Sequence, residues 1–74
     1  MNKELKRECI SVASELRTML LPHNEFMAFF IEAYPKVESD TELQDNIRLF
    51  MRGARPDAEI LKMAQHIIES RKHS

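Results

Sequence analysis

The chain has 74 residues, carries 11 Lys and Arg against 12 Asp and Glu, and is 43% hydrophobic. This length allows one domain, residues 1–74, whose small core favours a homodimer or a tightly packed protein partner. The hydrophobic content excludes a disordered tail, and a single Gly is too few for a turn-rich β-sandwich. The longest apolar run, 26–31, is far shorter than the ~20 residues of a membrane span, and one Cys excludes an internal disulfide. No secretion signal is visible, so we expect a cytoplasmic domain that does not enter membranes.

The first predicted helix covers residues 3–20. Its apolar residues recur in steps of four and three, which traces one stripe along a helix of period 3.6. The residues on this stripe are Leu5, Cys9, Val12, Leu16 and Met19. Asn2 is a suitable N-cap, and Pro22 cannot continue a helix, so we expect this helix to end near Leu20.

The second predicted helix covers residues 24–34, with Asn24 as its N-cap and Pro35 ending it. Apolar residues cover most of its circumference, and such a helix must be buried on several sides. It is therefore either the central helix of the domain or a surface for a partner or a second copy of the chain. The candidate residues for that surface are Phe26, Phe29, Phe30 and Tyr34.

The third predicted helix covers residues 40–52, after a short connection at 36–38. The sequence from Ser39 to Glu42 has the form of a capping box, in which Ser39 accepts from the backbone and Glu42 reaches back. Gly53, the only glycine, stands where a helix end needs a left-handed residue. The residues expected to face inward are Leu43, Ile47, Phe50 and Met51.

The fourth predicted helix covers residues 56–71, with Pro56 at its first position and Asp57 beside it. Its expected core residues are Ile60, Leu61, Ala64, Ile67 and Ile68. Taken together, these patterns predict an all-α fold, a compact bundle of four helices at about 3–20, 24–34, 40–52 and 56–71.

The sequence offers no set of residues for catalysis or metal binding. His23, His66 and His73 do not recur at the i, i+4 spacing of metal ligands. Cys9 lies on an apolar stripe, where a buried core thiol is expected. A phosphate-binding loop needs several glycines, and so small a core leaves little room for a catalytic pocket. We predict a protein that is not an enzyme and that needs no cofactor or metal.

The segment from residue 45 to residue 61 has a recognisable order of features. Two inward apolar residues three apart come first, then a basic residue and Gly, then a Pro-led helix with an Ile-Leu pair. In this sequence they are Ile47 and Phe50, then Arg52 and Gly53, then residues 56–61. With this order, residues 41–68 resemble the end of the Cro/phage-repressor (Xre-type) helix-turn-helix DNA-binding domain.

The resemblance implies that helix 40–52 is the recognition helix of a small transcriptional regulator that binds double-stranded DNA. It implies that this helix enters the major groove and presents four side chains to base edges: Thr41, Gln44, Asp45 and Arg48. Gln can bind adenine bidentately and Arg can bind guanine, whereas Arg52 and Arg55 would contact phosphates. A homodimer would place two such helices on half-sites about one helical turn apart.

The same residues also suit a helical domain that has no DNA-binding role. Acids in the first turn of a helix and arginines in the last complement its macrodipole, and Gly53 and Pro56 mark helix boundaries in any helical protein. In that case the charged face of helix 40–52 is solvated surface.

The alternative function is a non-enzymatic helical protein-interaction module, a phage- or plasmid-type accessory protein that docks on a larger partner through the aromatic helix 24–34. A purely structural role in an oligomer is a third hypothesis.

Overall fold

Four α-helices and one 3₁₀ helix follow one another in the computed structural model, which describes residues 2–73. They are α1 (Lys3–Met19), α2 (Phe26–Ala33), the 3₁₀ helix η1 (Pro35–Ser39), α3 (Thr41–Met51) and α4 (Ala58–Lys72). These described residues contain no strand, so the predicted all-α bundle of four helices is confirmed. The helix η1 is not among the predicted elements, and several helix ends differ from the prediction.

α1 begins where the sequence predicts, because Asn2 caps it. The Asn2 side chain accepts hydrogen bonds from the backbone N–H groups of Glu4 and Leu5, at 2.9 and 3.2 Å. At its other end the helix stops at Met19, which is 37% exposed, whereas Leu20 turns inward and is buried. Met19, the last residue of the apolar stripe, therefore lies outside the core. The buried residues within α1 are Cys9, Ala13 and Leu16.

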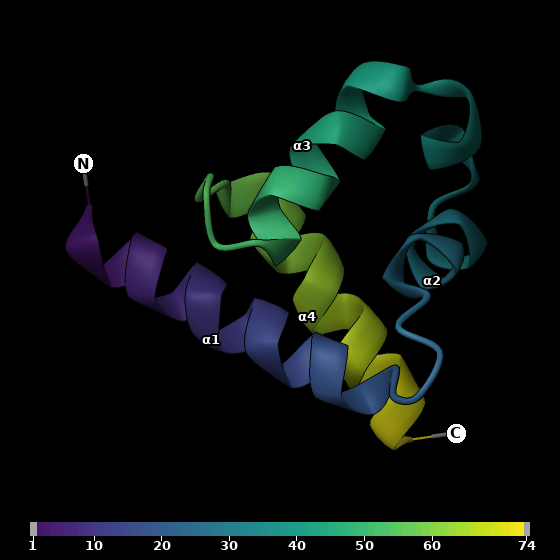
Figure 1. The fold of residues 1–74 in the computed structure, drawn as a ribbon, viewed down its shortest axis with the longest axis horizontal. Coiled ribbons are helices and arrows are strands. Elements are labelled where there is room, and N and C mark those ends of the chain that lie inside the picture. Colours follow the sequence, from purple (N-terminus) through teal and green to yellow (C-terminus); the bar gives the residue numbers. More distant parts are fainter. Residues whose placement is uncertain (1, 74) are drawn as a thin grey trace.

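α1 and α4 lie side by side and run in the same direction (Figure 1). Polar contacts join them along their length, because the amide of Gln65 donates to Glu8 at 3.0 Å and Lys72 pairs with Glu15 at 3.2 Å. Between these contacts the two helices bury their apolar faces against each other. Every core residue predicted for α4 is buried, and Met63 joins them; the buried set is Ile60, Leu61, Met63, Ala64, Ile67 and Ile68.

α2 begins later than predicted, because Asn24 does not cap it. Asn24 has a φ of +52°, which is the left-handed conformation and not the extended one of an N-cap. Glu25 takes the N-cap position and forms no side-chain hydrogen bond there. The helix ends at Ala33, and Pro35 prevents it from continuing, as the sequence predicts.

The segment expected to be a short connection at 36–38 forms the middle of η1. Pro35 stands at the first position of this 3₁₀ helix, and Val37 is fully buried. η1 therefore supplies a core side chain between α2 and α3. A single apolar residue between Lys36 and Glu38 has no periodicity, which is why the pattern of the sequence does not reveal this element.

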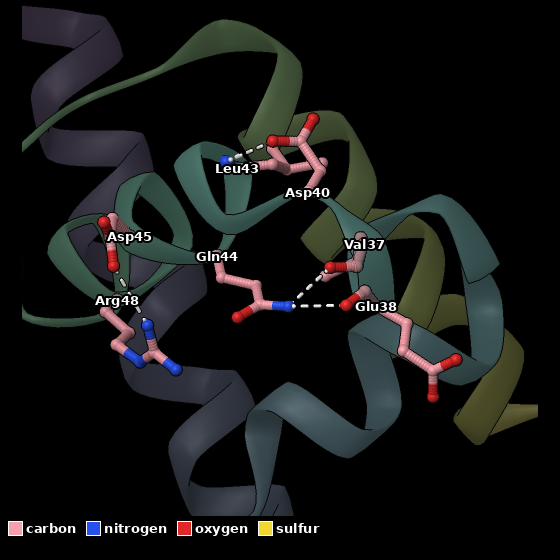
Figure 2. A network of polar contacts seen from close by, with 7 residues as sticks. All are labelled: Val37, Glu38, Asp40, Leu43, Gln44, Asp45 and Arg48. Atoms are coloured by element: carbon pink, nitrogen blue, oxygen red, sulfur yellow. Dashed lines mark hydrogen bonds and ion pairs between the residues drawn. The ribbon is translucent and has the colours of Figure 1, made fainter.

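The capping box predicted with Ser39 is wrong by one residue. Ser39 belongs to η1, where its hydroxyl donates to the carbonyl of Lys36 at 3.4 Å. Asp40 is the N-cap of α3, and its carboxylate accepts from the backbone N–H of Leu43 at 3.0 Å (Figure 2). Because η1 takes up Ser39, the next residue that can accept from the first turn of α3 becomes its cap.

α3 ends in a Schellman motif centred on Gly53, where the sequence predicts a left-handed residue. Gly53 has a φ of +76°, and its N–H donates to the carbonyl of Phe50 at 2.9 Å. The N–H of Ala54 donates to the carbonyl of Leu49, also at 2.9 Å. Ile47, Phe50 and Met51 are buried, and Leu43 is half-buried against the core.

α4 begins after Pro56 and not at it. The carboxylate of Asp57 accepts from the backbone N–H groups of Glu59 and Ile60, at 2.9 and 3.1 Å, so Asp57 is the N-cap. The prediction that Pro56 is the first helical residue is therefore wrong. Pro56 instead ends the loop that leads from Gly53 to the cap.

The core draws its largest side chains from all five elements. The fully buried ones are Leu16, Phe30, Val37, Ile47, Phe50 and Ile60. Among residues 2–73, no helix combines the length and the apolar character needed to cross a membrane.

Replacing Gly53 by Ala is expected to lower the free energy of unfolding by about 1 kcal/mol, because a left-handed backbone strains an L-residue. An added Cβ would meet only Cγ1 of Ile10 at 3.6 Å, which is ordinary contact, so the loss comes from the backbone. A change of this size lowers the Tm of so small a domain by roughly 4–8 °C.

Gly53→Asn is the matched control, because Asn tolerates the left-handed conformation better than Ala. The midpoint of its urea or thermal unfolding curve should lie between the midpoints of the wild type and Gly53→Ala. Equal stability of Gly53→Ala and the wild type would contradict a left-handed residue at the end of α3.

Candidate nucleic-acid interface

One face of α3 is exposed along the whole helix. Thr41, Asp45 and Arg48 are exposed on it, and Arg52 continues the face just after the helix ends. Steps of four and three residues place these side chains on one side of a helix. The sequence predicts three of them as base-contacting residues and the fourth as a phosphate contact, and these four share this outward face.

The charge along α3 and its two caps changes sign from one end to the other. Asp40, Glu42 and Asp45 lie in its first half, whereas Arg48 and Arg52 lie at its end. This order complements the helix macrodipole, so it also stabilises the helix. A polyanion is repelled by the first turn of α3 and attracted by the last. In a helix-turn-helix domain the N-terminal residues of the recognition helix contact base edges, so the end that the resemblance directs toward DNA is the acidic one.

Arg48 and Asp45 form an ion pair one turn apart (Figure 2). The guanidinium and carboxylate are 3.1 Å apart, and the two side chains are 53% and 73% exposed. An exposed pair of this kind contributes at most about 1 kcal/mol, because water screens it. Arg48 can therefore exchange this carboxylate for a phosphate or a base edge at low cost.

Gln44 does not share the outward face. Its amide nitrogen donates to the carbonyls of Val37 and Glu38, at 2.8 and 3.1 Å, and so joins α3 to η1 (Figure 2). Bidentate recognition of adenine needs that nitrogen as a donor. The prediction of Gln44 as a base-reading residue is corrected here, because its donor is already used within the domain. The unpredicted η1 provides the two carbonyls.

Arg55 lies apart from Arg48 and Arg52. It is exposed in the loop between α3 and α4, where its guanidinium donates to the side-chain oxygen of Asn46 at 2.8 Å. It borders a small crevice beside Gly53 and Cys9, on which neither Arg48 nor Arg52 lies. The three arginines that follow one another in the sequence are thus divided between two places on the surface.

A groove of about 680 Å³ lies beside the outward face of α3. Its polar lining comes from α1, from α3 and from the loop before α2, and its apolar lining includes Phe26 of α2 and Leu49 of α3. The complete set of lining residues is Arg17, Asn24, Phe26, Asp45, Arg48, Leu49, Met51 and Arg52. Three arginines and one aspartate give the groove a formal charge of +2.

Arg17 of α1 is the member of this groove that the sequence pattern does not reveal. Its guanidinium donates to the backbone carbonyl of Met51, in the last turn of α3. In the sequence, Arg17 is one of several charged residues on the polar side of an amphipathic helix. Only the packing of α1 on α3 brings it beside Arg52, so no local signal could have identified it.

A second group of basic residues lies on α1. Lys3, Lys6 and Arg7 surround Ile10, which is 43% exposed. These residues come from two turns of one helix, and Glu4 and Glu8 alternate with them in the sequence. The groove at α3 differs because its cations come from two packed helices and surround a concave surface.

The aromatic residues of α2 are mostly directed into the domain. Phe30 is fully buried, and Phe26, Phe29 and Tyr34 are half-buried against the core. α4 covers part of the exposed surface of these rings. The guanidinium of Arg71 lies 4.0 Å from the ring centre of Phe29, and the rings of His66 and Tyr34 pack edge-on with their centres 5.8 Å apart. Of the aromatic residues proposed as a partner surface, Phe26 is the one that lines the groove beside α3.

Among residues 2–73, no three His, Cys, Asp or Glu side chains are grouped as metal ligands would be. Cys9 is 3% exposed and packs in the core, which agrees with its prediction as a core thiol. Comparison of the chain with models of protein families, with curated proteins and with solved structures gives no match.

Replacing Gln44 by Met is expected to lower the free energy of unfolding by about 1 kcal/mol, because it removes two hydrogen bonds to carbonyls near the core. Met has a similar length and no donor. Gln65→Met is the matched control, since Gln65 donates to an exposed carboxylate, that of Glu8, and its loss should change stability little. Equal urea midpoints for the two variants would contradict the structural role of Gln44.

Proposed function

We propose that this protein is a small DNA-binding regulator that contacts duplex DNA with the outward face of α3. The observation that carries the proposal is the position of Arg48 and Arg52, exposed at the end of that face beside an open basic groove. No other described element covers the face, so a polyanion can reach it without rearrangement of the fold.

The dimensions of α3 suit the major groove. Its 11 residues correspond to a length of about 16 Å, and the groove of B-DNA is about 12 Å wide and admits one helix. The domain measures 32 × 27 × 20 Å, so one copy spans about one turn of DNA. A homodimer would extend this contact to a second half-site.

The residues of the outward face take separate roles in this proposal. Arg48 leaves Asp45 and binds a guanine edge, for which its two parallel donors are suited. Thr41 and Asp45 lie along the same face, where a hydroxyl can contact either kind of base and a carboxylate can accept from cytosine. Arg52, and Arg55 from the adjoining loop, bind phosphates.

The charge distribution sets the orientation. Because Asp40 and Glu42 lie at the start of α3, the proposal places the last turn of the helix, and not the first, nearest to the phosphates. The net charge of −1 makes nonspecific attraction weak, so affinity depends on this local basic surface.

The alternative, a protein-interaction module that uses residues 24–34, has less support. It depends on the aromatic cluster, and Phe30 is buried while Phe29 and Tyr34 are partly covered by α4. Docking on a larger protein through this helix would need those contacts to open.

The wild-type protein is expected to bind a labelled duplex of arbitrary sequence in a fluorescence-anisotropy titration at low salt. Arg52→Ala should weaken this binding about tenfold at ~50 mM salt and reduce the slope of log K against log [salt] by about 0.9, the value for one lost phosphate contact. Arg7→Ala is the control, because Arg7 lies in the other basic group, on α1. Weaker binding by Arg7→Ala together with unchanged binding by Arg52→Ala would contradict the proposed surface.

Asp45→Asn is expected to strengthen binding to the same duplex about two- to threefold, because removing one charge roughly 8 Å from a phosphate relieves about 0.5 kcal/mol of repulsion in water. Glu42→Gln should have a smaller effect, since Glu42 does not line the groove. A weaker complex with Asp45→Asn would show that the Asp45 carboxylate is a favourable contact in nonspecific binding, against this orientation.

A further inference from the structure

We infer that the groove beside the last turn of α3 is a phosphate-binding subsite in which Arg17 of α1 acts together with Arg52. The inference rests on the proposed function for its biological ligand, and it adds a residue outside α3 to the binding surface. The ligand chemistry is a phosphate group, either in a nucleic-acid backbone or on a free nucleotide.

Arg17 is held in position by the protein itself. One of its terminal nitrogens donates to the carbonyl of Met51, which directly precedes Arg52. A guanidinium has five N–H donors in one plane, so this bond leaves several donors for a ligand in the groove that Arg17 lines. Because the side chain is already anchored, binding a ligand costs less conformational entropy.

Arg17 is bonded to a backbone carbonyl and not to a carboxylate, so its formal charge is not neutralised. Within residues 2–73, neither Arg17 nor Arg52 forms an ion pair with a carboxylate. Asp45 is the acidic residue of the groove, and it pairs with Arg48. Two cations therefore border the same concave surface, one from the end of α1 and one from the end of α3.

The apolar part of the groove strengthens this site. Phe26 and Leu49 line it together with the arginines. Low-dielectric walls focus the field of nearby charges and weaken screening by water. A planar donor fork beside a second cation suits a tetrahedral oxyanion, for which Arg forms two parallel hydrogen bonds.

The first experiment titrates the 74-residue chain with inorganic pyrophosphate and follows the arginine Nε–Hε signals by NMR. The signals of Arg17 and Arg52 are expected to shift together and saturate, whereas sodium chloride of equal ionic strength should leave them in place. In Arg17→Gln, the Arg52 response should weaken at least fivefold, and Arg7→Gln should behave as the wild type. Failure of pyrophosphate to shift Arg17 overturns the inference.

The second experiment separates binding from a structural role of Arg17 in holding α3. Arg17→Lys keeps the charge and Arg17→Gln does not, while both lose the planar donor fork. If Arg17 binds phosphate, the slope of log K against log [salt] for duplex DNA falls by about one unit in Arg17→Gln and is restored in Arg17→Lys. A purely structural Arg17 would lower the Tm of both variants and leave the slope unchanged, which overturns the inference while the proposed function stands.

Competition identifies the source of the phosphate. Displacement of pyrophosphate from Arg17 by duplex DNA, with adenosine monophosphate much weaker, assigns the subsite to the nucleic-acid backbone. The reverse order assigns it to a free nucleotide. If the wild type binds no duplex at low salt but pyrophosphate shifts Arg17, the proposed function fails and the phosphate subsite stands. Should Arg17→Gln not fold, Arg52→Gln replaces it: the Arg17 response to pyrophosphate should weaken at least fivefold in this variant, and an undiminished response would overturn the inference.

Discussion

The way α3 ends determines what this small domain presents to solvent. The left-handed backbone at Gly53 closes the Schellman motif and turns the chain into the loop that leads to α4. α4 then packs along α1. The outward face of α3, which carries Asp45, Arg48 and Arg52, remains exposed. The same helix end offers the carbonyl of Met51 to Arg17, which fixes α1 beside the last turn. One backbone conformation thus sets both the packing of the core and the position of the basic groove.

The electrostatics of α3 explain how a slightly acidic protein can carry a locally basic surface. Acidic residues at the start of the helix and arginines at its end stabilise it through the macrodipole, and they also concentrate positive charge at one end. Arg17 adds to that end from another helix, so the groove has a charge of +2 in a chain whose net charge is −1. A structural and a functional role for these residues are therefore compatible, because the same charge order serves both.

The sequence predicts the fold better than it predicts the site, and the reasons are physical. Helices of two or more turns leave a periodic apolar pattern, and Pro35 and Gly53 have backbone preferences that mark helix ends. η1 leaves no such pattern, because its single buried residue, Val37, lies between two charged ones. Because the sequence pattern does not reveal η1, the predicted cap of α3 is Ser39, whereas the observed cap is Asp40. For the same reason the pattern does not reveal the carbonyls of η1 that accept from Gln44. The position of Arg17 in the groove depends on how α1 packs against α3, and periodicity along the chain carries no information about that packing.

The proposed function depends above all on the outward face of α3 being the surface that meets nucleic acid. Mapping the backbone amide shifts of the ¹⁵N-labelled protein on addition of an arbitrary duplex at low salt tests it most directly. We expect the perturbed residues to cluster at Asp45, Arg48 and Arg52 of α3 and at the end of α1, with α2 and the start of α1 unchanged. Perturbations centred on Lys3, Lys6 and Arg7, or on the aromatic residues of α2, would contradict it, as would a spectrum that does not change at all.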